Sequence, residues 1–228
     1  MRPLIVAIDG PAGAGKSSVS KELARRLGFT LVDTGAIYRC IALLASREKV
    51  ALDDDAALAK LLPRARISFQ VSGGENRVLL GGEDVSAAIR TPEMSMGASK
   101  VSSRPVVRQG LLELQRRLAL EAKRGAILEG RDIGTVVFPD ADVKFFLVAA
   151  PEVRARRRWE ELRQKGSNVP FEEVLADQVR RDRDDSSRAV APLRPAADAV
   201  LVDSSALPLD EVVRVLEEKV RPKVSTPG

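Results

Sequence analysis

The residues best suited to chemistry form one short loop, Gly10-Pro11-Ala12-Gly13-Ala14-Gly15-Lys16-Ser17. This loop fits the phosphate-binding template GxxxxGK[ST] at every fixed position. Glycines let backbone N–H groups approach a phosphate chain closely, and a helix that follows points its positive end at the anion. In this template the lysine reaches the β- and γ-phosphates, and the serine hydroxyl ligates Mg²⁺. The loop therefore predicts a nucleoside triphosphate site centred on Lys16 and Ser17.

The composition limits which other groups can take part. The 228 residues include no histidine, which excludes a histidine base, a Ser-His-Asp triad and a Cys/His metal site. Cys40 is the one cysteine, so no internal disulfide can form and we expect a cytoplasmic protein. No apolar run approaches the roughly 20 residues that cross a bilayer, and no signal peptide is visible. The chemistry must depend on carboxylates, lysine, arginine and a metal bound through oxygen.

The charge balance is compatible with anionic partners. The chain has 37 Lys and Arg against 32 Asp and Glu, a net charge of +5. Aromatic residues make up only 4%, which leaves few stacking platforms for single-stranded nucleic acid, whereas small anions such as nucleotides fit the same charge. A surface of mixed charges also explains this balance by itself, so the charge alone does not identify a partner.

The loop needs a strand before it and a helix after it, and the flanking sequence predicts both. Leu4–Asp9 is apolar apart from its last residue, as buried parallel strands are. Val19, Leu23 and Leu27 recur on one face of a helix that Gly28 ends. Further strands are predicted at 29–32, 126–128, 143–148 and 199–202, and further helices from 36 and from 151, and at 53–62, 106–123, 171–180 and 209–220. This alternation predicts an α/β fold with about five parallel strands.

Three stretches depart from the alternation. Segments 66–71 and 77–80 flank Ser72-Gly73-Gly74-Glu75-Asn76, which predicts a β-hairpin within an insertion at about 63–92. Gly134 and Pro139 predict an irregular segment. Residues 180–188 contain four arginines and three aspartates, so we expect a flexible loop that is too polar to bury.

Polar clusters follow three of the predicted strands, at 10–17, 33–39 and 129–132. The carboxyl ends of parallel strands meet at one edge of a sheet, so we expect the clusters to converge there. Within the second cluster, Thr34 could be no more than a helix cap. A small-molecule kinase needs arginines that close over the transferred group, and Arg39, Arg131 and the 181–188 stretch could supply them.

Two other classes of phosphate-loop protein fit less well. A GTPase needs a base-reading NKxD or TKxD motif, and the sequence has neither. An ATP-driven motor carries a metal-binding Asp after four apolar residues, for which Ala126-Ile127-Leu128-Glu129 is only a weak counterpart. These absences favour a small-molecule kinase.

The sequence resembles the bacterial cytidylate kinases, the (d)CMP kinases of the nucleoside monophosphate kinase group. Matching stretches cover nearly the whole chain in order: Ile8-Asp9-Gly10-Pro11 with the loop after it, Asp33-Thr34-Gly35-Ala36-Ile37-Tyr38-Arg39, Glu83-Asp84-Val85-Ser86 with Ile89-Arg90, Gly130-Arg131-Asp132-Ile133-Gly134-Thr135-Val136-Val137-Phe138-Pro139-Asp140-Ala141, and Arg188-Ala189-Val190-Ala191-Pro192-Leu193. The last three stretches are much more specific than the phosphate-binding loop.

The resemblance implies a P-loop NTPase fold in a single chain, 1–228. Its core would comprise 1–62, 93–150 and 189–228, with about five parallel strands flanked by helices. A small β-rich NMP-binding insertion would occupy about 63–92, and a helical, arginine-rich lid about 151–188. We expect a monomer without nucleic-acid or membrane partners.

The resemblance also implies residue roles. Thr34 would lie near the substrate, Arg39 and Arg131 would hold the acceptor phosphate, Ser99, Arg108 and Asp132 would read cytosine, and Arg181 and Asp185 would meet the ribose. Arg188, with Arg157 or Arg158, would face the transferred phosphoryl group, so the catalytic set is Lys16, Arg131, Arg157, Arg158 and Arg188. ATP would contact Gly10, Pro11, Ala12, Gly13, Ala14, Gly15, Lys16, Ser17 and Ser18, and Mg²⁺ would be bound by Ser17, with Asp33 through a water molecule as a candidate further ligand.

The implied reaction is ATP + CMP (or dCMP) ⇌ ADP + CDP (or dCDP), with Mg²⁺ as cofactor. The acceptor oxygen is already anionic at pH 7, so no general base is required, which agrees with the absence of histidine. Two alternatives stay open. One is a P-loop kinase for UMP or for another small metabolite such as shikimate. The other is a non-catalytic, nucleic-acid-binding P-loop protein. The stretch 130–141, which matches the cytidylate kinases, argues against this alternative.

Overall fold

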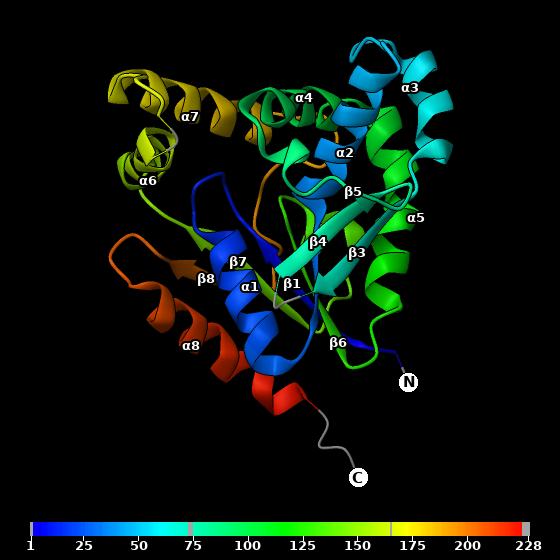
Figure 1. Ribbon diagram of the computed structural model, residues 1–228. Helices are drawn as coiled ribbons and strands as arrows, with labels where there is room; N and C mark the ends of the chain where they lie inside the picture. Colours follow the sequence, from blue (N-terminus) through cyan, green and yellow to red (C-terminus); the bar gives the residue numbers. More distant parts are fainter. Residues whose placement is uncertain (1, 73–74, 165, 225–228) are drawn as a thin grey trace. The chain divides into compact units, whose positions relative to one another are not determined.

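The computed structural model describes residues 2–72, 75–164 and 166–224, and its elements are labelled in Figure 1. The strands are β1 (Leu4–Asp9), β2 (Thr30–Asp33), β3 (Ile67–Ser72), β4 (Glu75–Leu80), β5 (Glu83–Asp84), β6 (Gly125–Gly130), β7 (Val143–Val148) and β8 (Val200–Asp203). The α-helices are α1 (Lys16–Leu27), α2 (Thr34–Arg47), α3 (Asp55–Leu61), α4 (Pro92–Ser102), α5 (Pro105–Leu120), α6 (Pro151–Gln164), α7 (Phe171–Ser186) and α8 (Leu209–Val220). Shorter helical turns are η1 (Leu62–Arg64), η2 (Ala88–Arg90), η3 (Ile133–Val137) and η4 (Arg221–Lys223).

The main sheet has five strands in the order β2-β6-β1-β7-β8. β1 is its central strand and pairs in parallel with both β6 and β7, and β7 pairs in parallel with β8. In the β1–β6 register Ile8 lies opposite Glu129 and Asp9 opposite Gly130. The predicted α/β fold with a five-stranded parallel sheet is confirmed, and the register brings the ends of β1 and β6 together.

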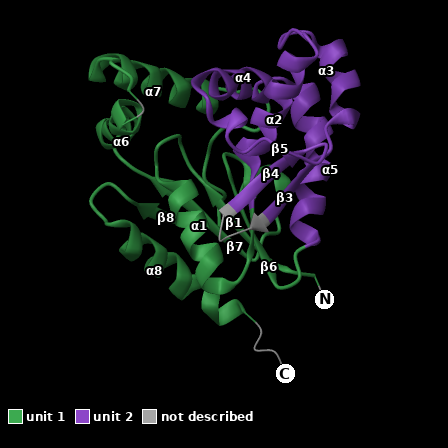
Figure 2. Cartoon of the chain, in the orientation of Figure 1, with its two compact units in different colours: residues 1–31, 122–228 green, residues 32–121 purple. Residues whose placement is uncertain are grey.

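The chain forms two compact units, coloured separately in Figure 2. Unit 1 comprises residues 1–31 and 122–228, and unit 2 comprises residues 32–121. The predicted division into core, NMP-binding insertion and lid concerns function rather than compactness, and it remains a prediction. In the described part of the chain, no helix combines the length and apolar character that crossing a membrane requires.

An apolar core in unit 1 fixes where the phosphate-binding loop begins. Ile8 of β1 and Phe145 of β7 are almost fully buried, and they belong to the same cluster as Leu23 of α1 and Leu216 of α8. Burying a large aliphatic or aromatic side chain stabilises the fold by about 1.5–3 kcal/mol. The core therefore holds β1 and α1 in place, and this fixes the two ends of the phosphate-binding loop that connects them.

Unit 2 contains helices and a small antiparallel sheet in the order β3-β4-β5. β3 and β4 form the predicted hairpin, with Ile67 opposite Leu80; the predicted turn at 73–74 lies outside the described residues. α4 packs closely on α2, since a Cβ atom added to Gly97 would lie 2.8 Å from the Ala42 Cβ. The sequence pattern does not predict α4.

The predicted flexible loop at 180–188 is wrong for most of its length, because α7 continues to Ser186. Composition suggested a loop because no apolar residue anchors this part of the helix. The structure anchors it with charge instead: Asp182 pairs with Arg154, and Asp185 pairs with Arg131. Ion pairs with residues far away in the sequence thus replace apolar packing.

Two smaller expectations also need correction. The segment after Asp132 is irregular only in part, because Ile133–Val137 forms a π-helical turn, whereas 138–142 around Pro139 has no regular secondary structure. The cap of α2 is Asp33 rather than Thr34, since Asp33 Oδ1 accepts a 2.8 Å hydrogen bond from the Ala36 N–H. Thr34 is the first helical residue and is buried.

Candidate active site

The phosphate-binding loop connects β1 to the N-terminus of α1, as its sequence predicts. Lys16 is buried, and its Nζ donates a 2.7 Å hydrogen bond to the carbonyl oxygen of Pro11 within the loop. Burial, together with the positive charge of Arg131, lowers the pKa of Lys16 from 10.5 to about 7, although Glu129 and Asp9 oppose the shift. A buried ammonium whose pKa has fallen this far gains strongly from an anionic ligand.

The loop is tied to β6 through a carboxylate that the sequence analysis did not assign. Ser17 Oγ donates a 2.8 Å hydrogen bond to Glu129 Oε2, and Glu129 is only 4% exposed. In the sequence, Glu129 is only a weak counterpart of the metal-binding residue of motors. A charged residue directly after a short apolar strand was the available signal, but only the β1–β6 register shows that it faces the loop.

A second carboxylate, Asp9, lies at the end of β1 and binds the segment that follows β6. Its two oxygens accept 2.8 Å hydrogen bonds from the backbone N–H groups of Ile133 and Gly134. Burial raises the pKa of Asp9 to about 6, although these hydrogen bonds and Lys16 lower it. Asp9 therefore fixes the turn that follows Asp132, whereas the sequence pattern indicates only that it is the polar end of a strand.

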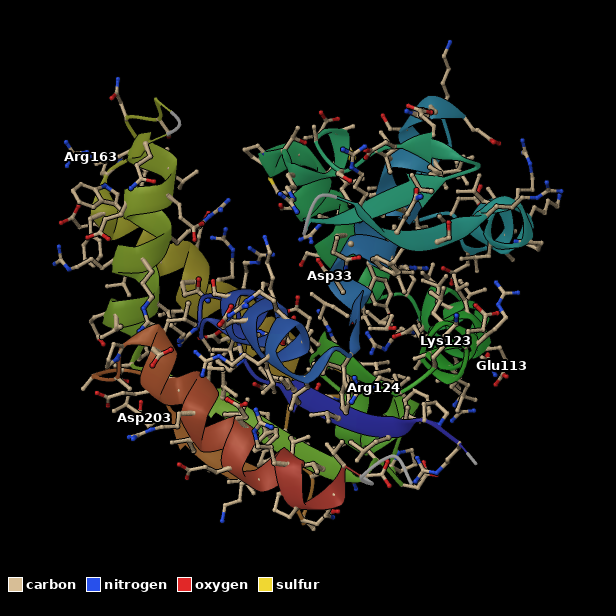
Figure 3. The ribbon with its side chains drawn as sticks, turned by 60° about the horizontal axis from the view of Figure 1, so that its bottom comes forward. Asp33, Glu113, Lys123, Arg124, Arg163 and Asp203 are labelled. Carbon is tan, nitrogen blue, oxygen red and sulfur yellow. The ribbon has the colours of Figure 1, made fainter. Side chains whose placement is uncertain are left out.

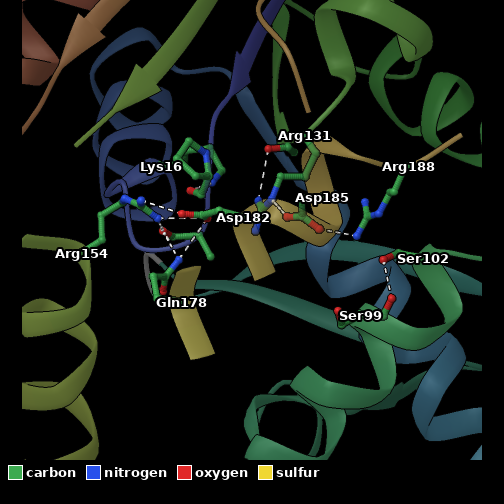
Figure 4. A network of polar contacts seen from close by, with 12 residues as sticks. Lys16, Ser99, Ser102, Arg131, Arg154, Gln178, Asp182, Asp185 and Arg188 are labelled. Atoms are coloured by element: carbon green, nitrogen blue, oxygen red, sulfur yellow. Dashed lines mark hydrogen bonds and ion pairs between the residues drawn. The ribbon is translucent and has the colours of Figure 1, made fainter. Parts of the chain in front are cut away.

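Three arginines gather around one carboxylate in unit 1, and Figure 4 shows two of their ion pairs. Arg131 Nε lies 2.9 Å from one oxygen of Asp185, and Arg188 pairs with the other. Burial alone would raise the pKa of Asp185, but Arg131 and Arg188 outweigh it and hold the pKa below its usual value. Arg181 lies near the same pair. Burial and the charge of Arg131 lower the pKa of Arg181, and the charge of Asp185 opposes this shift. The cluster has more positive than negative charge, which suits it to bind an anion.

The two arginines predicted on α6 lie in different surroundings. Arg157 donates to the carbonyl oxygen of Ser204 at 2.7 Å, and Ser204 Oγ donates to the carbonyl oxygen of Ala14 at 3.0 Å. Arg158 pairs with Glu161 on the same helix, at 3.1 Å. Arg163, which is labelled in Figure 3, lies near the end of α6. Its guanidinium group lies over the Trp159 ring. Arg157 thus belongs to the surroundings of the phosphate-binding loop, while Arg158 is part of a surface pair.

Unit 2 carries the other predicted site residues. Arg39 pairs with Asp33 at 3.1 Å, and its Nε is buried with no hydrogen-bond partner among the described residues. Arg108 is buried, donates to the carbonyl oxygen of Ser102 at 3.0 Å and lies over the Tyr38 ring. The carbonyl of Ser99, one turn away on α4, accepts from the Ser102 hydroxyl.

The oxygen ligands fit a magnesium ion that is held mainly by its substrate. Among the described residues, no group of three or more His, Cys, Asp or Glu side chains could hold a metal ion. Ser17 Oγ and the Glu129 carboxylate nevertheless meet beside the phosphate-binding loop. Mg²⁺ is usually bound through one or two protein oxygens, water and substrate phosphates, and this pair suits that arrangement.

Comparison with known proteins agrees with this geometry. A family model described as "Cytidylate kinase" matches residues 6–222. The cytidylate kinase of Geobacter sulfurreducens is 55% identical over 228 residues, covering 100% of this chain and 97% of that protein. The cytidylate kinase of Geobacter sp. strain M21 is 53% identical and covers 97% and 94%. An uncharacterised protein from Eubacterium ventriosum of known structure shares the fold, with a TM-score of 0.51 at 12% identity, over 96% of this chain and 98% of that one.

Proposed function

Because the chain belongs to the cytidylate kinase family, we propose how its own residues carry out the family's reaction. The chain is a (d)CMP kinase, which transfers the γ-phosphoryl group of ATP to CMP or dCMP and releases ADP with CDP or dCDP. One observation carries the assignment of roles. Lys16 of the phosphate-binding loop lies beside the ion pair of Arg131 and Asp185 (Figure 4), and both charges act on its buried ammonium, so the loop adjoins the arginine cluster.

The donor site is the phosphate-binding loop. We assign the triphosphate of ATP to residues 10–18, whose backbone N–H groups (Pro11 has none) and the N-terminus of α1 would face the phosphates. The Lys16 ammonium would leave the carbonyl of Pro11 for the phosphates, because a dianionic partner neutralises its buried charge better than a carbonyl dipole does. Arg157, beside Ser204 and Ala14, would border the same nucleotide.

We assign the acceptor phosphate to Arg39 and Arg131, as the family resemblance implies, together with Arg188. Arg131 and Arg188 share Asp185, and a phosphate that reaches them would compete for the same N–H groups. The Nε of Arg39 is buried and has no hydrogen-bond partner among the described residues, so it is available to donate to a phosphate oxygen. A buried, unpaired guanidinium N–H is unfavourable unless a ligand accepts from it.

The chemical step needs positioning and charge neutralisation rather than proton transfer. The acceptor oxygen of CMP is anionic at neutral pH, so it can attack the γ-phosphorus in line without a general base. Lys16, Arg131 and Arg188 would neutralise charge on the transferred group, and Arg158 could join them. Fixing both reactants in this geometry supplies most of the rate enhancement.

Magnesium is the proposed cofactor. When bound, Mg²⁺ would neutralise charge on the donor phosphates and orient them. Ser17 would be its protein ligand, and Glu129, which accepts from Ser17, would orient the hydroxyl and accept from a metal-bound water. Asp33 could contribute only through water, since its oxygens already accept from Ala36 and Arg39.

Cytosine is proposed to be read by donors and acceptors that match its edge. Arg108 can donate to the O2 and N3 atoms, and the Asp132 carboxylate can accept from the 4-amino group. Ser99 and Thr34 are proposed as further polar contacts, and Arg181 and Asp185 as contacts to the ribose. The substrates are therefore CMP, dCMP and ATP. We further propose a cytoplasmic monomer that binds neither nucleic acid nor membranes.

Direct product analysis tests this function. The protein is incubated with ATP and MgCl₂ and, in separate reactions, with CMP, UMP or shikimate; the products are separated by anion exchange, and retention of the protein on DNA is measured in parallel. We expect CDP and ADP to appear in equal amounts. ADP without CDP would indicate an ATPase, phosphorylation of shikimate or UMP in preference to CMP would support the alternative kinases, and DNA retention without ADP release would support the nucleic-acid alternative.

A further inference from the structure

A buried network in unit 1 links the phosphate-binding loop to α7, and it has no part in the roles assigned so far. Its members are Arg154 of α6, Gln178 and Asp182 of α7, and the carbonyl oxygen of Ala12 in the loop (Figure 4). Only 4% of the Arg154 side chain is exposed. A charged network at this depth is unfavourable unless its geometry is well satisfied, so each of its contacts matters.

The carbonyl of Ala12 is held from two helices at once. Arg154 Nη1 donates to it at 3.1 Å, and Gln178 Nε2 donates to it at 3.0 Å. Arg154 in turn forms a bidentate pair with Asp182, at 3.1 Å and 2.6 Å, and its Nε donates to the carbonyl of Ala149 at 2.8 Å. A single loop carbonyl thereby connects α6 and α7.

The backbone of the loop is shaped to let α6 come this close. Gly13 has a φ of +75°, and a Cβ atom added there would lie 2.9 Å from the Cβ of Arg154. Both the left-handed conformation and the short distance favour glycine. The contact between the loop and Arg154 is therefore a close packing contact as well as a polar one.

On α7, the residues of the proposed acceptor site lie next to this network. Arg181 follows Gln178 by three residues, and Asp185 follows Asp182 by three residues. Gln178 and Asp182 are four residues apart and lie on one stripe of the helix, while Arg181 and Asp185 form a neighbouring stripe. Asp185 is the residue that Arg131 and Arg188 share. One helix thus contacts the donor loop with one stripe and carries the acceptor cluster on the next.

We propose that Arg154, Gln178 and Asp182 are positioning residues that couple occupation of the donor loop to the placement of Arg181 and Asp185. Triphosphate binding fixes the loop backbone, the Ala12 carbonyl then fixes the register of α7, and the acceptor cluster is held ready for the monophosphate. ATP and CMP should therefore strengthen each other's binding by the same factor, as thermodynamic linkage requires. This inference rests on the proposed function.

Calorimetry measures the coupling directly. The dissociation constant of CMP is measured without and with a saturating non-hydrolysable ATP analogue and Mg²⁺, and the ratio is the coupling factor. For the wild type we expect a factor of about 10, within the usual range for coupled sites. Gln178→Leu and Arg154→Lys each weaken the contact to Ala12 and should reduce the factor at least threefold. Each ligand alone should still bind.

The control is Arg180→Gln, an exposed substitution on the same helix, which should leave the coupling factor unchanged. If Arg154→Lys does not fold, as judged by circular dichroism, Gln178→Leu alone decides. A folded variant with a lower melting temperature but the wild-type coupling factor would show a merely structural role and overturn the inference. Wild-type protein that forms CDP without any coupling would also overturn it, whereas wild-type protein that forms no CDP would overturn the proposed function instead.

Discussion

Ser17 Oγ donates a 2.8 Å hydrogen bond to Glu129 Oε2, so the phosphate-binding loop and the end of β6 are joined by one contact between side chains. The two residues are 112 positions apart in the sequence. The contact forms because β6 pairs in parallel with β1, which leads into the loop. In the proposed function, this carboxylate orients the Ser17 hydroxyl toward the Mg²⁺ that accompanies the triphosphate.

Replacing Glu129 should therefore affect the use of magnesium. In Glu129→Gln the amide accepts more weakly from Ser17 and from a metal-bound water. Loss of such an outer contact typically reduces metal affinity or activity about 10–100-fold. We expect kcat to fall by about that factor and the Mg²⁺ concentration for half-maximal rate to rise, with KM for CMP little changed. Titration of activity with MgCl₂ measures both; Glu218→Gln, an exposed change on α8, is the control. An unchanged magnesium dependence would remove Glu129 from this role.

Lys16→Met should nearly abolish turnover while the fold survives. The substitution removes a charge proposed to stabilise the transferred group, and groups of this kind contribute about 10²–10³-fold in rate. Circular dichroism checks the fold, and kcat is compared with that of Lys21→Met, an exposed change on the same helix. If a folded Lys16→Met retains more than about a tenth of the wild-type kcat, the assignment of this lysine is wrong.

The lowered pKa of Lys16 predicts proton uptake on binding ATP. In the free protein the pKa is about 7, so the ammonium is lost as the pH rises above 7. Bound phosphates favour the ammonium and raise the pKa again, so binding near pH 8 should take up a proton and weaken as the pH increases. Calorimetry with an ATP analogue in buffers of different ionisation enthalpy measures this uptake. It should be absent in Lys16→Met, and equal uptake in both proteins would assign the proton to another group.

Much of this arrangement could be predicted because its determinants are local. The apolar runs of β1 and β7 gave the bounds that the structure has, and the amphipathic pattern of 209–220 gave those of α8. The motif likewise placed the loop between a strand and a helix. In each case neighbouring residues carry the whole signal.

Features that depend on distant partners could not be predicted. The polar end of α7 is helical because Arg131 and Arg154 pair with its aspartates, and those partners lie 54 and 28 residues away. The positions of Asp9 and Glu129 become meaningful only once β6 is known to lie beside β1. The sequence does not predict α4, because only three of its residues are buried and one of them is a glycine, so the helix has no clear apolar stripe. The three are Met94, Gly97 and Val101.

Selection of cytosine should depend on Asp132. UMP presents a carbonyl where CMP presents an amino group, and that carbonyl would face the Asp132 carboxylate. A site built to pair polar groups rejects a mismatched analogue by as much as about 10⁴-fold. Asp132→Asn offers both a donor and an acceptor, so the CMP/UMP ratio of kcat/KM should fall at least tenfold. Asp140→Asn, an exposed change after the same turn, should keep the wild-type ratio. An unchanged ratio in Asp132→Asn would exclude it from base reading.

Residues 181–188 should reach full protection from hydrogen exchange only when both nucleotides are bound, with part of that protection already present with the ATP analogue alone. Arg131 and Arg188 then gain anionic partners in addition to Asp185, and closure would exclude water. Hydrogen exchange with an ATP analogue, with CMP and with both measures this protection. Arg188→Ala should lower kcat far more than it weakens binding of the ATP analogue, whereas the exposed Arg183→Ala should resemble the wild type. Equal protection in every state would show that this end of α7 is static.

The preference of the enzyme for CMP is measured by the specificity constant for each acceptor. ADP release is coupled to NADH oxidation, and kcat/KM is measured at fixed MgATP for CMP, dCMP, UMP, AMP and GMP. We expect the highest kcat/KM values for CMP and dCMP, a value at least tenfold lower for UMP, and little turnover of AMP or GMP. A value for UMP or a purine monophosphate that equals or exceeds the value for CMP would contradict this expectation.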